Sequence, residues 1–422
     1  MARSKLKKEI KRQISAFGKK HNEVREIYQH SLLLHRKMLY YKQARKTKVD
    51  DHTILFTTFM GRNYSCSPRA IFEEMQRREM YDYTYVWVFR KYQRYEELTY
   101  KYKNVIIVRY GSPEFYYYMA RAKYWVTNSR ILDAIPKRKE QVLIQCWHGT
   151  PLKRIGLDVA QYANAIRSTK NFYHLYKHDS EMYDYLISPS AFCTEKFTSA
   201  FGLQERPEII LEIGYPRNDA LFNFDDIKVI ATKYNIGIPQ DKKVILYAPT
   251  WRDDQHEAGK GYTYKNQMDL DLMMEHFGDE YVILYRTHYF VANKLDLSKY
   301  KGFVYNVSSY DDINDLYIIS DMLITDYSSV FFDYADLRRP ILFYMYDLED
   351  YKTNLRDFYI DLSELPGPIA QTQEELIKEI EEIDQFDEKY HDAYAAFNAK
   401  FNYLDDGYAA GRAIDRCILN KE

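Results

Sequence analysis

The sequence lacks paired cysteines. Its four cysteines, at positions 66, 146, 193 and 417, form no Cys-x-x-Cys pair and no spacing typical of metal ligands. We therefore expect reduced thiols, a cytosolic environment and no zinc site.

A long apolar run and an overall excess of charge are also missing. No run approaches the roughly eighteen residues that a membrane-spanning helix needs, and no cleavable signal pattern is present. The 422 residues include 60 Lys and Arg against 61 Asp and Glu, so the whole chain lacks the basic signature of a nucleic-acid-binding protein. We expect a protein that neither crosses a bilayer nor binds nucleic acid.

The charge that is present is unevenly distributed. Residues 1–49 carry a net charge of +12, which leaves −13 for the rest of the chain. Leu6, Ile10, Ile14 and Phe17 recur at helical spacing among the lysines, a pattern typical of an amphipathic helix lying on an anionic membrane. We predict that residues 1–49 form a basic amphipathic membrane-association segment. The alternative is a solvated basic helix or a disordered arm.

From Thr53 onward, short apolar runs alternate with helical patterns, which is typical of α/β domains. The breaker run 237–241 separates two such sets. We predict two Rossmann-like domains, an acceptor-side domain at 50–230 and a donor-binding domain with C-terminal helices at 231–422. The expected strands are Ile54–Phe59, Tyr83–Phe89, Val105–Val108, Tyr124–Thr127, Val142–Cys146, Tyr185–Ser188, Ile209–Glu212, Val244–Tyr247, Tyr281–Tyr285, Phe303–Asn306, Met322–Thr325 and Ile341–Tyr344.

One histidine follows a predicted buried strand directly. The strand ends at Cys146, and Thr150 with the following proline reads as a helix cap and first helical residue. His148 would then lie at a strand-to-helix turn, with Gly149, Thr150 and Lys153 at the new helix N-terminus. Such a turn suits an imidazole base beside an anion. The alternative is a buried histidine bonded to a carbonyl.

Positive and hydroxyl side chains follow three strands of the second predicted domain. Ser328 and Ser329 open a helix after one strand, Arg286 and His288 follow another, and Arg252 follows a third. Carboxyl ends of parallel strands share one edge of a sheet, where open α/β folds bind ligands. We therefore predict a diphosphate site that needs no metal. Taken singly, each feature could be a plain helix cap or a surface ion pair.

Several motifs together resemble one known family, the CDP-glycerol glycerophosphotransferases, which include teichoic acid primases and polymerases. The resemblance runs from about residue 53 to 415. The motifs are Asn63-Tyr64-Ser65-Cys66-Ser67-Pro68, Gln145-Cys146-Trp147-His148-Gly149-Thr150-Pro151-Leu152-Lys153, Gly214-Tyr215-Pro216-Arg217-Asn218-Asp219, Tyr247-Ala248-Pro249-Thr250-Trp251-Arg252, Arg286-Thr287-His288, Thr325-Asp326-Tyr327-Ser328-Ser329-Val330-Phe331-Phe332-Asp333 and Asp406-Gly407-Tyr408-Ala409.

The resemblance implies a metal-independent GT-B architecture with no cofactor. It also implies transfer of a polyol phosphate from a CDP-activated donor to a hydroxyl acceptor, with peripheral attachment at the cytoplasmic face of the membrane. His148 would be the base. The donor diphosphate would be held by Arg252, Arg286, His288, Ser328, Ser329 and Asp333, while Asn63 and Ser65 would join Gly149, Thr150 and Lys153 on the acceptor side.

Four functions remain open at this point. The first uses CDP-glycerol and a polyprenyl diphosphate-linked saccharide or polymer acceptor in teichoic acid synthesis, and the second uses CDP-ribitol. The third is a nucleotide-sugar glycosyltransferase of the same architecture that makes capsule. The fourth is a non-enzymatic membrane or nucleic-acid adaptor that uses the basic arm, which gives no reason for the polar residues to gather at strand ends.

Overall fold

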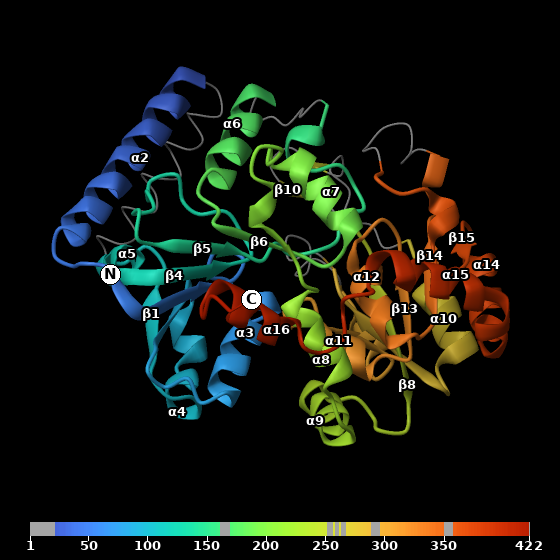
Figure 1. Ribbon diagram of the computed structural model, residues 1–422. Helices are drawn as coiled ribbons and strands as arrows, with labels where there is room; N and C mark the ends of the chain where they lie inside the picture. Colours follow the sequence, from blue (N-terminus) through green and yellow to red (C-terminus); the bar gives the residue numbers. More distant parts are fainter. Residues whose placement is uncertain are drawn as a thin grey trace.

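The computed structural model describes residues 22–160, 169–250, 256–257, 261–262, 267–287, 296–349 and 358–421. Two parallel sheets stand side by side, each with helices on both faces (Figure 1). The expected pair of Rossmann-like domains is thereby confirmed. Within the described residues, no helix is long and apolar enough to span a bilayer.

The first sheet has seven strands in the order β3-β2-β1-β4-β5-β6-β7, and all neighbours are parallel. The order reverses between β1 and β4, which creates a crevice at the carboxyl ends of these strands. The strands are β1 (Asp50–Thr57), β2 (Thr84–Phe89), β3 (Val105–Arg109), β4 (Ala122–Thr127), β5 (Val142–Gln145), β6 (Tyr185–Ser188) and β7 (Ile210–Glu212).

The second sheet repeats this arrangement with six parallel strands in the order β12-β11-β8-β13-β14-β15. Its reversal lies between β8 and β13. The strands are β8 (Lys243–Ala248), β11 (Tyr281–Tyr285), β12 (Val304–Asn306), β13 (Met322–Thr325), β14 (Ile341–Tyr344) and β15 (Ile369–Ala370), and β9 (His256–Glu257) pairs separately with β10 (Gly261–Tyr262). Each predicted strand overlaps one of these; β9, β10 and β15 were not predicted.

Helices cover the faces of both sheets. Those before the second sheet are α2 (Asn22–Ala44), α3 (Cys66–Arg77), α4 (Leu98–Lys101), α5 (Pro113–Arg121), α6 (Thr169–Ser180), α7 (Ala191–Ala200), α8 (Asp219–Phe222) and α9 (Asp226–Ile236). Those that follow are α10 (Leu270–Phe277), α11 (Ile313–Ile319), α12 (Val330–Tyr334), α14 (Gln373–Glu381), α15 (Phe386–Phe401) and α16 (Ala409–Cys417).

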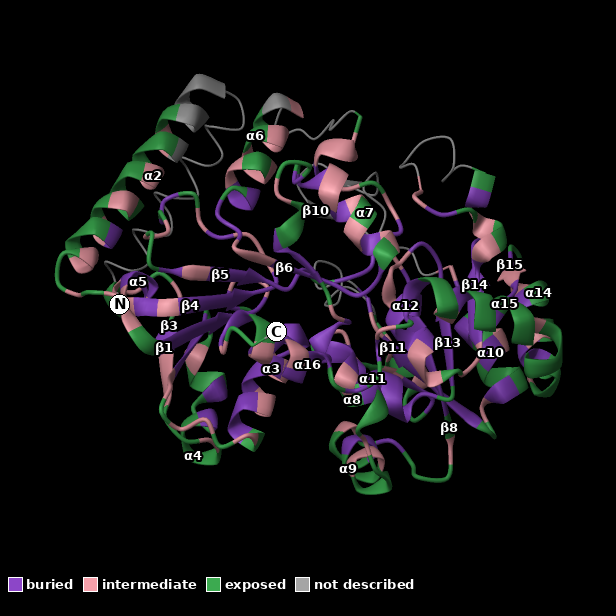
Figure 2. Cartoon of the chain, viewed as in Figure 1, coloured by how far each residue is buried: buried purple, intermediate pink, exposed green. Residues whose placement is uncertain are grey.

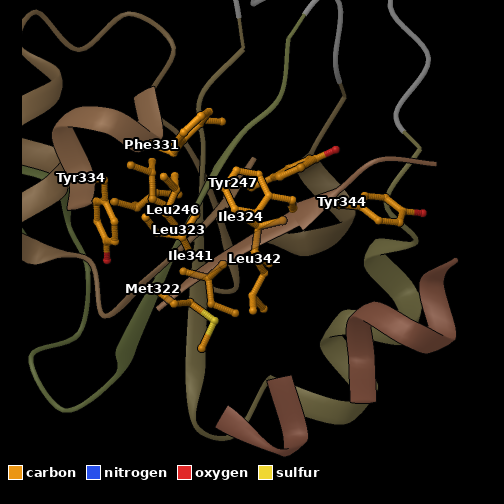
Figure 3. Packing of buried hydrophobic residues seen from close by; sticks show 14 of the residues in the cluster. Leu246, Tyr247, Met322, Leu323, Ile324, Phe331, Tyr334, Ile341, Leu342 and Tyr344 are labelled. Atoms are coloured by element: carbon orange, nitrogen blue, oxygen red, sulfur yellow. The ribbon is translucent and has the colours of Figure 1, made fainter. Parts of the chain in front are cut away.

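The strands are apolar on both faces, which is why their sequences read as continuous apolar runs. In β1, Leu55 faces the cluster that includes Phe115 of α5, whereas Phe56 faces Phe72 of α3 on the opposite side. Figure 2 shows the two sheets as the buried centre of each domain. In the second domain, side chains of β8, β13 and β14 interdigitate with those of α12 (Figure 3). Fully burying one such side chain contributes about 1.5 to 3 kcal/mol.

The last helix does not belong to the domain to which the sequence assigned it. Residues 231–422 were predicted as one donor-binding domain, but Ile414 and Cys417 of α16 are buried in the core of the first domain. Figure 1 shows α16 beside α3. Asp219 accepts hydrogen bonds from the backbone N–H groups of Ala409 and Ala410, and thereby fixes the start of α16.

The basic N-terminal segment is described only in part. Leu6, Ile10, Ile14 and Phe17 lie outside the described residues. The following helix, α2, packs against α5 and buries Tyr40. Its outward side shows an exposed face (Figure 2).

Candidate functional site

A cleft of about 500 Å³ lies where the carboxyl ends of the two sheets face each other. Its walls come from both domains and contain seven of the predicted site residues. The lining residues include Trp147, His148, Gly149, Thr150, Pro151, Leu152, Lys153, Ala248, Pro249, Thr250, Arg286, Thr287, Tyr327, Ser328 and Ser329. The carboxyl ends of β5 in the first sheet and of β8, β11 and β13 in the second therefore meet at one cleft, on the edge at which open α/β sheets bind ligands.

His148 lies on the first-domain wall and is exposed to the cleft. Its Nδ1 lies 2.8 Å from the backbone carbonyl oxygen of Asn128. Because a carbonyl oxygen only accepts, the proton of a neutral imidazole must be on Nδ1, which leaves Nε2 as the basic nitrogen. The carbonyl bond considered for a buried histidine is thus present, but it orients an exposed ring.

The protonation state of His148 follows from its surroundings. The crowded walls displace water and lower the pKa of His148 to about 4; the Asn128 hydrogen bond opposes this effect, and repulsion from Arg217 adds to it. Water in the cleft still reaches the exposed ring and tempers the shift, but its direction leaves the imidazole neutral at pH 7.

The backbone around His148 is held in an unusual conformation. Trp147 has φ +50°, a left-handed value that costs a non-glycine residue about 1 to 2 kcal/mol. The Gln145 side chain accepts the Trp147 N–H at 3.0 Å, and the indole packs on Phe201 with ring centroids 4.9 Å apart. These contacts hold the strained turn in place and keep the neighbouring imidazole at the cleft.

Ser328 and Ser329 lie on the second-domain wall, at the turn from β13 into α12. The predicted helix start after a buried strand is confirmed here. Asp326 fixes the turn, because its carboxylate accepts the N–H groups of Thr250 at 2.8 Å and Tyr327 at 2.6 Å. The ends of β8 and β13 are thereby joined.

Arg286 also lines the cleft, at the end of β11. One guanidinium nitrogen, Nη1, donates to the carbonyl oxygens of Val307 and Tyr310, both at 3.0 Å. These bonds orient the side chain and keep a positive charge on this wall.

The two walls touch at Gly149. A Cβ atom on this glycine would lie only 2.9 Å from Ser329 Oγ. With any larger residue, either the Ser329 hydroxyl must rotate away or the loop that carries His148 must move from the turn that carries the serines. Gly149 therefore allows the two predicted halves of the site to approach each other.

The helix predicted to begin at Pro151 does not form. Lys153 instead makes an antiparallel bridge with Phe358, and Leu152 accepts the N–H of Tyr359 at 2.8 Å. Pairing with this distant segment keeps residues 150–153 extended. Gly149, Thr150 and Lys153 line the cleft as predicted, but not as a helix N-terminus.

Three other predicted site residues lie away from the cleft. Asp333 is buried and forms an ion pair of 2.7 Å with Arg217 instead of facing a donor. Asn63 donates to the Asp311 carbonyl oxygen at 3.1 Å, and Ser65 is buried at the N-cap of α3. The turn after β1 directs Asn63 toward the residues that precede α11. Arg252 and His288 lie outside the described residues.

Two residues near the site were not predicted. Asn128 follows β4 and could have been found as a polar residue directly after a buried strand; its Oδ1 accepts the Phe59 N–H at 2.8 Å. Arg217 belongs to a motif noted in the sequence, but its partner Asp333 is 116 positions away, so only the fold pairs them.

A larger groove of about 1350 Å³ lies between α3, α11 and α16, and contains none of the predicted site residues. We place the site in the smaller cleft because the strand ends of both sheets converge there. Among the residues that the structure describes, no group of three His, Cys, Asp or Glu side chains is arranged to hold a metal ion.

Comparison with known proteins identifies relatives along most of the chain. The teichoic acid poly(glycerol phosphate) polymerase of Bacillus subtilis is 41% identical over 377 residues, which cover 89% of this chain and 50% of that protein. The chain thus spans about half the length of that relative. The teichoic acid glycerol-phosphate transferase of Staphylococcus aureus is 39% identical over 394 residues, covering 93% of this chain and 97% of that protein.

A solved structure and a family model agree with this. The wall teichoic acid polymerase TagF, in a histidine-to-asparagine variant soaked with CDPG, superposes with a TM-score of 0.84 at 37% identity, covering 96% of this chain and 98% of that chain. The model described as CDP-Glycerol:Poly(glycerophosphate) glycerophosphotransferase matches residues 39–419. The chain therefore belongs to the CDP-glycerol:poly(glycerophosphate) glycerophosphotransferase family.

Proposed function

We propose that this protein transfers glycerol phosphate from CDP-glycerol to a hydroxyl group of a lipid-linked acceptor and releases CMP, in the synthesis of teichoic acid or a related cell-surface polymer. One observation carries the proposal: the His148 imidazole, with Nδ1 bonded to the Asn128 carbonyl and Nε2 available, shares a cleft with the Ser328–Ser329 turn. CDP-ribitol remains the second candidate donor.

The reaction would proceed in one displacement. Nε2 of His148 accepts the proton of the acceptor hydroxyl, whose oxygen attacks the phosphorus that carries glycerol. The new P–O bond forms as the bond from that phosphorus to the bridging oxygen breaks, and CMP leaves with the electron pair. Ser328, Ser329 and Arg286 would stabilise the charge on the diphosphate through hydrogen bonds and Coulomb attraction.

The donor specificity can be tested directly. The purified full chain is incubated with a polyprenyl diphosphate-linked acceptor and, in turn, with CDP-glycerol, CDP-ribitol and UDP-sugars, while release of CMP or UDP is measured. We expect CMP release with CDP-glycerol. Release of UDP alone would support a glycosyltransferase instead, and no release from any donor would contradict the proposal.

The base is tested by His148→Asn. General base catalysis contributes about 10² to 10⁴-fold, so the rate of transfer should fall by at least 10²-fold while CDP-glycerol still binds. His276→Asn is the matched control, because His276 lies exposed on α10 and contacts Glu381. A His148→Asn variant with near-normal turnover would remove the imidazole from the mechanism.

Peripheral attachment to the cytoplasmic face of the membrane is part of the proposal. On α2, the exposed side chains Ile27, Leu34, Met38 and Tyr41 are spaced seven, four and three residues apart, so they form one apolar stripe. The exposed side chain of Lys42 lies next to this stripe. An apolar stripe with cationic flanks suits the interface of an anionic bilayer.

The membrane proposal is best tested by substitution. Removing residues 1–49 would also remove Tyr40 from the first-domain core, so Leu34→Gln/Met38→Gln is preferable. Sedimentation with vesicles that contain phosphatidylglycerol should weaken in this variant and with added salt. Ile230→Gln, on the exposed side of α9, is the control. Equal sedimentation of all three proteins would place the membrane contact elsewhere.

A further inference from the structure

Arg217 is a buried cation directly behind the loop that carries His148. It follows β7 in the first domain, and its side chain is only 7% exposed. Nη2 lies 4.0 Å from where a Cβ of Gly149 would be, so the glycine leaves no side chain between the guanidinium and the loop. The guanidinium also stacks on Tyr215, 4.5 Å from the ring centroid.

The partner of Arg217 comes from the other domain. Nη2 donates to Asp333 Oδ1 at 2.7 Å, and Asp333 belongs to α12, the helix that Ser329 begins. The same guanidinium nitrogen therefore approaches the His148 loop on one side and holds the serine helix on the other. The Arg217 backbone carbonyl accepts Asn314 Nδ2 at 2.6 Å, which fixes the turn against α11.

We propose that Arg217 is a positioning residue with two effects: it holds the Ser329 helix against the His148 loop, and its positive charge adds to the effect of the crowded walls in disfavouring protonation of the imidazole. Asp333 limits the second effect. The second effect rests on the proposed function, because the charge on the imidazole matters for catalysis only if His148 is the base of the proposed reaction. A cation near an imidazole disfavours protonation, because the imidazolium would be a second positive charge.

The surroundings of His148 support this assignment. Burial is the largest cause of the lowered pKa of His148, and Arg217 is the charged side chain whose repulsion adds to it. The other charged side chains described in the cleft are Lys153 and Arg286, which are also positive. On the remaining sides are the Phe59 ring, the Asn128 carbonyl and the uncharged Ser328–Ser329 turn. Lys153 and Arg286 are unchanged in the variants below, so their effect cancels in the comparison.

The test is an NMR titration of the labelled His148 imidazole in the full chain, with His148→Asn identifying the resonance. In Arg217→Gln, we expect the midpoint of the titration to rise by about one pH unit. In Arg217→Lys, the charge remains and the midpoint should stay near that of the unmodified protein. In Asp333→Asn, Arg217 loses its counter-charge, so the midpoint should not rise.

The Asp333→Asn result separates a charge effect from a packing effect. Disrupted packing would hydrate the imidazole and raise the midpoint in both Arg217→Gln and Asp333→Asn. A rise in Asp333→Asn, or an unchanged midpoint in folded Arg217→Gln, would overturn the proposal. Arg217→Gln loses half of a buried ion pair. If it does not fold for that reason, the Asp333→Asn titration still tests the proposal, because a rise of the midpoint in that variant overturns it.

The titration needs no substrate, so its outcome is independent of whether the protein uses CDP-glycerol. If transfer is also observed, the acid limb of the pH profile of kcat/KM should move with the NMR midpoint. At pH 5.5 Arg217→Gln should then lose a larger fraction of its activity than Arg217→Lys. Parallel losses at pH 5.5 and pH 8 would indicate a purely structural role for Arg217.

Discussion

At the scale of single residues, the site depends on a glycine as much as on a base. Gly149→Ala would place a methyl group 2.9 Å from Ser329 Oγ, closer than such atoms can approach. Overpacking of this kind costs about 1 to 3 kcal/mol, so we expect CDP-glycerol to bind about tenfold more weakly, as measured by calorimetric titration. Gly278→Ala, on the far side of the second domain, should leave donor affinity unchanged.

A buried carboxyl beside the site makes the stability of the protein depend on pH. Burial raises the pKa of Asp405, against the hydrogen bonds that it accepts from the Tyr215 N–H and Asn218 Nδ2. The folded chain therefore keeps a proton that the unfolded chain releases near pH 4, so the free energy of unfolding decreases as the pH rises from about 4 toward neutrality.

Asp405→Asn should remove this decrease in the free energy of unfolding with rising pH. The amide carries no charge and keeps an acceptor oxygen for the Tyr215 N–H. Its NH2 group faces Asn218 Nδ2, which lowers the stability at every pH and leaves the comparison between pH values intact. We expect urea denaturation to show that the drop in stability between pH 5 and pH 8 is smaller by about 1 to 3 kcal/mol than in the unmodified protein. The exposed Asp392→Asn provides the comparison. A drop of the same size in Asp405→Asn would assign the pH dependence to other carboxyl groups.

At the scale of elements, α16 completes the core of the first domain, although the whole second domain lies between them in the sequence. Ile414 is fully buried between α16 and the first sheet. Ile414→Ala should lower the free energy of unfolding by about 2 to 5 kcal/mol, as measured by chemical denaturation followed through the fluorescence of Trp87 and Trp125. Arg416→Ala, on the exposed side of the same helix, should change it by less than about 0.5 kcal/mol. Equal effects would mean that α16 is only loosely attached.

The strands could be predicted because each strand is buried on both faces. This burial requires a continuous run of apolar residues, which is visible in the sequence. The helix after Pro151 could not be excluded, because the segment that holds residues 150–153 extended, Phe358–Tyr359, lies two hundred positions later. The assignment of α16 to the second domain was wrong for the same reason. A helical pattern shows which face is apolar, but not which sheet covers it.

The candidate site, like the fold, could be predicted only in part. His148, Arg286 and the serine pair follow strands directly, so the shared edge of parallel sheets brings them to one cleft. Arg217 and Asp333 could not be paired from the sequence, because their contact depends on how the two domains meet. The left-handed turn at Trp147 was also not predictable, since a bulky residue rarely adopts that conformation.

At the scale of the whole molecule, an ion pair between Arg69 of α3 and Asp312, the N-cap of α11, is one of several contacts that hold the domains together. Arg69 Nη1 lies 3.1 Å from Asp312 Oδ2, and the same carboxylate oxygen accepts the Cys66 N–H at 3.3 Å. We expect the unmodified protein to unfold in one thermal transition in scanning calorimetry and Arg69→Ala to unfold in two, because the domains lose part of their coupling. Arg77→Ala is the matched control, because Arg77 pairs with Glu74 within α3. One unchanged transition in Arg69→Ala would mean that other contacts couple the domains.

The position of α16 also bears on the order in which the protein is made. A ribosome synthesises the seven strands of the first domain before the second domain, but α16, which covers one face of their sheet, emerges only after it. The entire second domain is translated in between and can fold first as a unit. During that interval, the apolar surface around Phe72 and Ile71 on α3 is only partly covered, and it is the surface that a nascent-chain chaperone would bind.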